Sequence, residues 1–187
     1  MTPTHATDLE LAHRIASGDA EATESFVRKH YARLYRFMHH LTRHVEDAQD
    51  LTQQAFIQAK NQIASYRGKA SLRTWLYRIA LHEYTHWRRK RRKTASLDSV
   101  PPTYDPSYEA CIEAEILLAA ITRLPERLKE AFLLAEVEEL PLEEVAKVLH
   151  VPVGTIKSRL FHARRRLCML LNERQENEIE AKPILEA

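Results

Sequence analysis

The stretch 140–171, LPLEEVAKVLHVPVGTIKSRLFHARRRLCMLL, contains two helical patterns separated by a very short break. In the first, apolar residues recur at the i, i+3, i+4, i+7 spacing of one buried helix face: Leu142, Val145, Ala146 and Leu149. The second keeps the same buried stripe through Val153, Ile156, Leu160, Ala163 and Leu167. Two helices joined by about three residues must cross steeply, so the stretch predicts a helix-turn-helix.

The break and the outer face of the second helix favour DNA binding. His150 suits the tight turn because histidine tolerates positive φ better than most residues, and Pro152 fits the first turn of a helix. No acid occurs between residues 152 and 171. Donors and cations occupy the face opposite the buried stripe: Thr155, Lys157, Ser158, Arg159, His162 and Arg165. Such groups contact phosphates and base edges in the major groove, although a helical hairpin with a solvated cationic face is the alternative.

Composition bounds the fold class. The 187 residues have room for one ordinary domain or two small ones, and 44% hydrophobic with 29% charged residues is typical of a soluble globular protein. Only three glycines favour helices, so we expect an all-α fold. The longest apolar run, 116–121, is far too short for a membrane helix, and the N-terminus lacks a signal-peptide pattern. We therefore expect a cytoplasmic protein, with Cys111 and Cys168 as buried thiols.

The chain divides into two basic regions separated by an acidic one. Residues 94–122 contain five acids and no Lys or Arg, and the proline-rich segment SLDSVPPTYDPS, 96–107, predicts a flexible linker. We expect two small helical domains, 7–93 and 108–172, with a linker at 94–107 and a charged tail at 173–187. The first expected helix begins with a capping box at Thr7 and ends near Gly18. Further helices are expected over 19–42, 45–64, 72–93 with Ser71 as N-cap, 108–123 and 125–137.

A possible metal motif lies in IALHEYTHWRRKRRK, 79–93. His82, Glu83 and His86 match the His-Glu-x-x-His signature of zinc proteases. However, a run of six cations follows it, and a third ligand would have to come from Glu109 or Glu113 beyond the linker. A zinc protease is therefore a minor alternative, and we expect no metal, no cofactor and no small-molecule substrate.

The stretch VPVGTIKSRLFHARRRL, with the preceding LPERLKEAFLLAEVEELPLEEVAKVL, closely resembles the C-terminal DNA-binding domain of bacterial extracytoplasmic-function (ECF) sigma factors. In the first half, HVEDAQDLTQQAFIQA, 44–59, resembles the segment by which this family binds the clamp helices of RNA polymerase. SLRTWLYRIA, 71–80, resembles its promoter-melting helix. The resemblance extends from about Leu9 to Leu171, in the order and spacing of the family.

The resemblance implies a non-enzymatic, two-domain transcription initiation factor. Its partners would be the beta and beta-prime subunits of core RNA polymerase, promoter DNA in duplex and single-stranded form, and an anti-sigma factor. Core polymerase would contact Asp47, Asp50, Leu51, Gln53 and Phe56. The minus-thirty-five element would be bound as duplex by Thr155, Lys157, Ser158, Arg159, Phe161, His162 and Arg165. The regulon would be one of stress, envelope or metal response.

The minus-ten element would be bound as an unpaired strand, which requires aromatic faces and cations. The residues that supply them, with neighbouring donors, are Tyr66, Lys69, Ser71, Arg73, Trp75, Arg78, His82, His86, Arg88 and Arg89. Trp75 is equally compatible with a core position. At the positions of His82 and His86 the family usually carries Asn and Asp, a departure that concerns the minus-ten preference and not the fold. A conventional helix-turn-helix regulator that binds duplex DNA alone is the second hypothesis.

Overall fold

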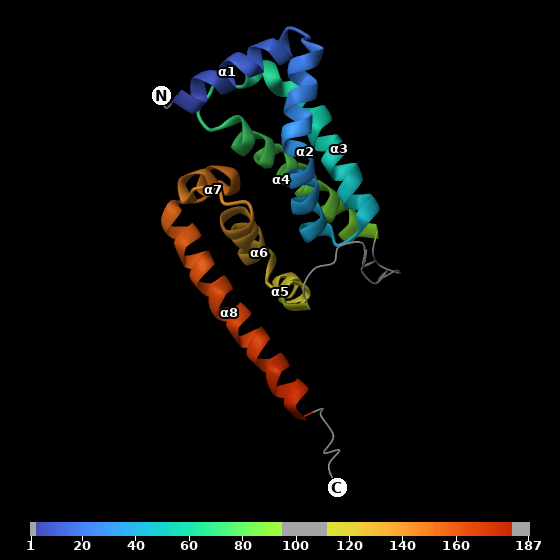
Figure 1. Ribbon diagram of the computed structural model, residues 1–187, viewed down its shortest axis with the longest axis vertical. Coiled ribbons are helices and arrows are strands. Elements are labelled where there is room, and N and C mark those ends of the chain that lie inside the picture. The colour runs from blue at the N-terminus through green and yellow to red at the C-terminus, as the bar shows by residue number, and fades with distance from the viewer. Residues whose placement is uncertain (1–2, 95–111, 181–187) are drawn as a thin grey trace.

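The protein is helical throughout the part that the structure describes. The computed structural model describes residues 3–94 and 112–180, and these residues form helices with no strand (Figure 1). This confirms the all-α prediction. The predicted linker beyond residue 94 and the end of the predicted tail lie outside the described residues. None of the described helices is long and apolar enough to cross a membrane.

The first helical unit, residues 3–94, is built around three packed helices. Its elements are α1 (Pro3–Ala16), α2 (Ala20–Thr42), α3 (Val45–Gln62), a 3-10 turn η1 (Ile63–Ser65) and α4 (Leu72–Thr94). Helices α2, α3 and α4 pack against one another, and α1 lies against η1, α2 and α4. Leu34 and Phe37 of α2, Ala55 of α3 and Leu76 of α4 are completely buried, so the core of this unit lies among the three helices.

Polar side chains set the helix ends in this unit. Asp19 caps α2 by accepting a hydrogen bond from the N–H of Ala22 at 3.0 Å. Ser71 caps α4 as predicted, because its Oγ accepts from the N–H of Thr74 at 3.1 Å. The prediction for α1 is wrong at its start, since this helix begins at Pro3, four residues before Thr7.

Helix α1 supports the turn that leads into α4. The carboxylate of Asp8 accepts a hydrogen bond from the N–H of Leu72 at 2.8 Å, so α1 satisfies a free donor in the first turn of α4. Gly68 has φ of +67°, and a Cβ atom there would lie 3.0 Å from Cδ1 of Leu9. The turn therefore requires glycine both for its backbone conformation and for the close approach of α1.

The second helical unit, residues 112–180, contains the predicted helix-turn-helix. Its elements are α5 (Ile112–Thr122), α6 (Glu126–Phe132), a π-helical turn η2 (Leu133–Val137), α7 (Leu142–Leu149) and α8 (Val153–Glu180). The single helix predicted over 125–137 is wrong in its second half, where the N–H of Glu138 donates to the carbonyl of Leu133 at 2.9 Å. Helix α8 also continues to Glu180, well into the segment predicted as a tail.

The turn between α7 and α8 has the predicted geometry. His150 has φ of 53°, and its N–H caps α7 on the carbonyl of Ala146. Val145 of α7 and Ile156 of α8 are completely buried, and Leu160, Ala163 and Leu167 continue the buried stripe along α8. The apolar spacing in the sequence thus identified the packed faces of both helices. Cys168, in contrast, is an exposed free thiol, and its predicted burial is wrong.

The two units pack against each other in the structure. Helix α4 lies against α7, and α6 lies between α4 and α8 (Figure 1). The buried apolar residues of both units belong to one continuous cluster. The DNA-binding segments predicted in each half of the sequence, α4 and α8, are therefore held in one compact body.

Candidate nucleic-acid interface

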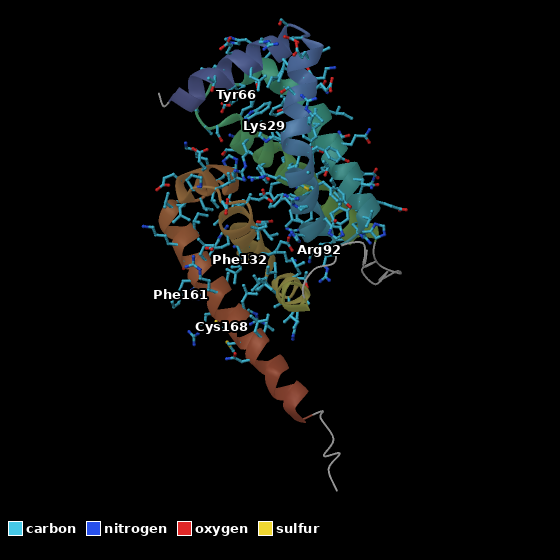
Figure 2. All side chains as sticks on the ribbon, in the orientation of Figure 1. Lys29, Tyr66, Arg92, Phe132, Phe161 and Cys168 are labelled. Atoms are coloured by element: carbon cyan, nitrogen blue, oxygen red, sulfur yellow. The ribbon has the colours of Figure 1, made fainter. Side chains whose placement is uncertain are left out.

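The outer face of α8 is cationic and exposed. Lys157, Ser158, His162 and Arg165 are exposed, and Thr155 and Arg159 are half-buried. Phe161 is 61% exposed, and its ring points away from the rest of the protein (Figure 2). Among the described residues, Lys157, Arg159 and Arg165 form no ion pair, whereas Arg164 pairs with Glu136 of η2. This face leaves its predicted donors and cations available to an anionic ligand.

The residues predicted for an unpaired strand are divided between surface and interior. Lys69, Arg78, His86 and Arg89 are exposed, and the side chain of His82 is 76% exposed. The structure corrects the position of Tyr66, which is buried and donates its hydroxyl hydrogen to the carbonyl of Ala70 at 2.7 Å (Figure 2). This burial raises the pKa of Tyr66 to about 12. Its ring is a core group that no base can reach in this structure.

Trp75 lies next to Tyr66 and remains half-buried. The two rings meet edge to face with centroids 5.6 Å apart. Ser71, beside them, uses its hydroxyl as the cap of α4. Trp75 therefore packs against the core with one part of its ring and leaves another part accessible.

Two cations of the predicted strand-binding set contact acids of the second unit. Arg73 donates to the backbone carbonyl of Glu138 and lies 3.4 Å from its Oε2, and Tyr77 donates to the same carboxylate. Arg88 lies 3.3 Å from Oε2 of Glu126. Burial raises the pKa of Tyr77 and of Tyr84, with the adjacent carboxylate adding to the effect in each case.

The face predicted to bind polymerase lies on α3, at the other side of the first unit from α7. Asp50 and Gln53 are exposed, while Leu51 is buried at 6% exposure, so its predicted place on the surface is corrected to a core position. Phe56 is half-buried, and its ring stacks on Tyr31 at a centroid distance of 6.2 Å. A groove of about 470 Å³, whose lining includes Tyr31, Gln53 and Ile57, runs beside it.

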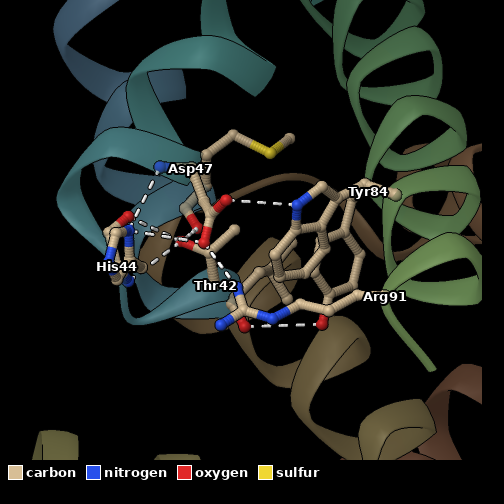
Figure 3. A network of polar contacts seen from close by, with 8 residues as sticks. Thr42, His44, Asp47, Tyr84 and Arg91 are labelled. Carbon is tan, nitrogen blue, oxygen red and sulfur yellow. Dashed lines mark hydrogen bonds and ion pairs between the residues drawn. The ribbon is translucent and has the colours of Figure 1, made fainter. Parts of the chain in front are cut away.

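Asp47 belongs to a polar network that joins α3 to the end of α4. Its carboxylate accepts a hydrogen bond from the Trp87 indole N–H at 3.3 Å and pairs with Arg91 at 2.5 Å (Figure 3). His44, the N-cap of α3, lies 3.4 Å from the same carboxylate. Asp47 therefore fixes the basic end of α4 against α3 and is less available to an external partner than Asp50.

Comparisons with known proteins identify the family. Residues 26–94 match sigma-70 region 2, and residues 114–167 match sigma-70 region 4. The ECF RNA polymerase sigma factor SigM of Mycobacterium tuberculosis is 33% identical over 167 residues, which cover 88% of this chain and 84% of that protein. The ECF RNA polymerase sigma-E factor of Escherichia coli is 31% identical over 176 residues, with 84% and 91% covered. The chain belongs to the ECF RNA polymerase sigma factors.

Two solved structures share the fold of this ECF sigma factor. CnrH in complex with the cytosolic domain of CnrY superposes with a TM-score of 0.71 at 23% identity, covering 89% of this chain and 97% of CnrH. The sigma factor RpoE in complex with the anti-sigma factor NepR from Bartonella quintana gives a TM-score of 0.70 at 25% identity, with 80% and 96% covered. Each superposition covers more residues than either helical unit contains, so each includes parts of both units.

Membership of the family decides between the hypotheses drawn from the sequence. An ECF sigma factor is a transcription initiation factor rather than an enzyme, so the zinc-protease alternative and the conventional regulator are both set aside. Within the described residues, no group of three or more His, Cys, Asp or Glu side chains is placed to hold a metal ion. The side chains of Glu109 and Glu113, considered as third ligands, lie outside the described residues.

Sequence reasoning missed two features of this ECF sigma factor. The groove beside Phe56 was missed, although Tyr31 and Tyr35 stand one turn apart on α2 and could have indicated an aromatic surface. The contacts of Glu126 and Glu138 with α4 were also missed. They join residues 38 to 65 positions apart, and no local pattern reports such a pairing.

Proposed function

We propose that this sigma factor directs core RNA polymerase to promoters whose minus-thirty-five element is bound as duplex by α8. The observation that carries the proposal is the exposed, acid-free face of α8 beyond a helix-turn-helix turn. Lys157 and Arg159 have the chemistry to contact phosphates and guanine edges, and the exposed Phe161 offers an apolar contact for a thymine methyl group. Together with Thr155, Ser158, His162 and Arg165, they form the proposed duplex-binding face.

The minus-ten strand, in this proposal, is bound by α4 and the turn before it. The exposed cations Lys69, Arg78 and Arg89 would contact the strand backbone, and the exposed part of the Trp75 ring would offer a surface for stacking. Arg73 and Arg88 would join them once released from their acidic partners. His82 and His86 are exposed on the same helix, and each can donate or accept a hydrogen bond to a base.

The beta and beta-prime subunits of core polymerase would be contacted through the α3 face. Asp50 and Gln53 are exposed there, and the adjacent groove with Phe56 offers apolar area. An anti-sigma factor is a further proposed partner, supported by the similar sigma factor RpoE, which was solved in complex with the anti-sigma factor NepR. A cytoplasmic location and a stress, envelope or metal-response regulon complete the proposal.

The test is run-off transcription on fragmented host genomic DNA by core polymerase, with and without the purified protein. We expect discrete new transcripts that share two spaced upstream boxes. Lys157→Ala with Arg159→Ala should lower duplex affinity for the upstream box by roughly tenfold or more, since contacts of this kind contribute about 1–3 kcal/mol. The matched control is Arg28→Ala with Lys29→Ala, which removes two exposed cations from α2. Unchanged promoter output from the α8 variant would contradict the proposal.

A further inference from the structure

The second half of α2 presents a row of cations that the proposed function does not use. Arg33, Arg36, His40 and Arg43 follow one another at spacings of three and four residues, which places them along one side of the helix. Arg33 and Arg36 are exposed, while His40 and Arg43 are half-buried. At the rise of an α-helix the row is about 15 Å long. These four residues are called the α2 row below.

No acid within the described residues neutralises the α2 row. The sequence has no Asp or Glu between residues 25 and 45. In the part of the chain that the structure describes, Arg33, Arg36 and Arg43 form no ion pair. Burial lowers the pKa of His40 to about 4, and the charges that add to this effect all belong to basic side chains, Arg36 and Arg43 among them. The row therefore has a positive potential that an external anion can neutralise.

One end of the α2 row lies beside the first turn of α4. Helices α2 and α4 pack against each other (Figure 1). Burial lowers the pKa of His30 on α2 to about 4, and the charges of Arg73 on α4 and of Arg33 in the row both add to this effect. Both guanidinium groups therefore lie close to the same imidazole. The row thus continues the set of cations that the proposed function assigns to the unpaired strand.

The chemistry of the α2 row suits the backbone of a nucleic acid. Guanidinium groups donate charge-assisted hydrogen bonds to phosphate oxygens. The row contains no Tyr, Trp or Phe on which a base could stack. Its length of about 15 Å spans roughly four phosphates at the spacing of a stacked strand. Contacts of this kind add affinity without sequence preference, because the phosphate group is the same at every position.

An unpaired strand fits the position of the row better than a duplex does. The row adjoins Arg73 of the strand-binding set, whereas the proposed duplex-binding face lies on α8 in the other helical unit. A flexible strand can follow the surface from α4 onto α2. A duplex is too stiff to bend from one helix to the next over this distance.

We propose that the α2 row is a second contact for the phosphate backbone of the unpaired strand, which extends from α4 along α2. Arg33 and Arg36 are its main groups, since they are exposed in this structure and need no partner to be displaced. The inference rests on the proposed function for the identity of the strand. It adds a surface on a different helix, whose role is to bind phosphates rather than to select bases.

The experiment measures how strand affinity depends on salt. Fluorescence anisotropy with a short labelled single-stranded DNA compares the full-length wild type with Arg33→Gln/Arg36→Gln between about 50 and 200 mM salt. Arg33→Lys/Arg36→Lys keeps both charges. The matched control, Arg28→Gln/Lys60→Gln, removes two exposed cations that lie outside the row. Circular dichroism and thermal unfolding verify that each variant keeps its fold.

We expect the slope of log affinity against log salt to fall by about 1.4 in Arg33→Gln/Arg36→Gln, because each phosphate contact with a single strand contributes about 0.7. Affinity at about 0.1 M salt should fall roughly tenfold, and equally for a thymidine-rich and a mixed-sequence strand. The lysine variant and the control should keep the slope of the wild type. A duplex of the same length should show no change of slope, because it binds at α8.

An unchanged slope in Arg33→Gln/Arg36→Gln, or no strand binding by the wild type, would overturn the proposal. An equal fall in slope for the duplex would overturn the assignment to an unpaired strand. Tighter binding of poly-glutamate than of the strand by the wild type would overturn it as well and would make the row a surface for an acidic polypeptide. Run-off transcription by the wild type with core polymerase tests the proposed function separately, since it does not depend on the α2 row being the contact.

Discussion

His30 and His40 on α2 have imidazoles that burial keeps neutral. Desolvation lowers the pKa of each to about 4, and nearby cations and His39 add to the effect. His30 also packs against Phe26 with ring centroids 5.0 Å apart. Protonating either ring in the folded protein would place a charge in a desolvated position close to other basic side chains.

The unfolding free energy should therefore fall on acidification. A histidine whose pKa is lower in the folded state contributes stability that is complete above about pH 6.5 and is lost as the pH falls toward 4. Between pH 7 and pH 5 we expect a loss of about 1–2 kcal/mol per histidine, measured by urea unfolding. His30→Gln with His40→Gln should flatten this dependence, while His13→Gln, at an exposed position, should not. An equal slope in all three proteins would contradict the explanation.

At the scale of elements, the turn of the helix-turn-helix contains backbone strain. His150 adopts φ of 53°, a conformation that costs a residue with a Cβ about 1 kcal/mol relative to glycine. We expect His150→Gly to raise the free energy of unfolding by about 0.5–1 kcal/mol, and His150→Val to lower it, in thermal or urea unfolding. A glycine variant less stable than the valine variant would show that the imidazole makes a contribution that the backbone does not explain.

The elements also show how far the sequence could predict this protein. The buried stripes of α7 and α8 and the cap at Ser71 are local patterns, and the structure confirms them. Leu51 and Tyr66 were placed on binding surfaces because motif position does not report which way a side chain turns. The π turn η2 and the contacts of Glu138 arise from packing between distant segments. No spacing in the sequence encodes them, so the packing of the two helical units against each other could not be predicted.

At the scale of the whole molecule, polymerase binding should depend on exposed residues of α3. Phe56 does not suit a test of this surface, because it packs against Phe26 and Tyr31 and its loss would weaken the fold. We expect Asp50→Ala with Gln53→Ala to reduce co-purification with core polymerase by roughly tenfold while leaving the melting temperature unchanged. Glu24→Ala with Gln62→Ala, at exposed positions of α2 and α3, serves as the control. Normal co-purification would move the docking surface elsewhere.

The hydrogen bond from Leu72 to Asp8 has a practical consequence for dissecting this protein. The family match to region 2 begins at residue 26, so a recombinant fragment cut at that boundary would omit α1. Such a fragment would leave the first turn of α4 with an unsatisfied donor and would uncover the apolar contacts of Ala12 and Ile15. Its melting temperature should be several degrees below that of residues 3–94, and poor strand binding by it would reflect a frayed helix rather than a missing DNA contact.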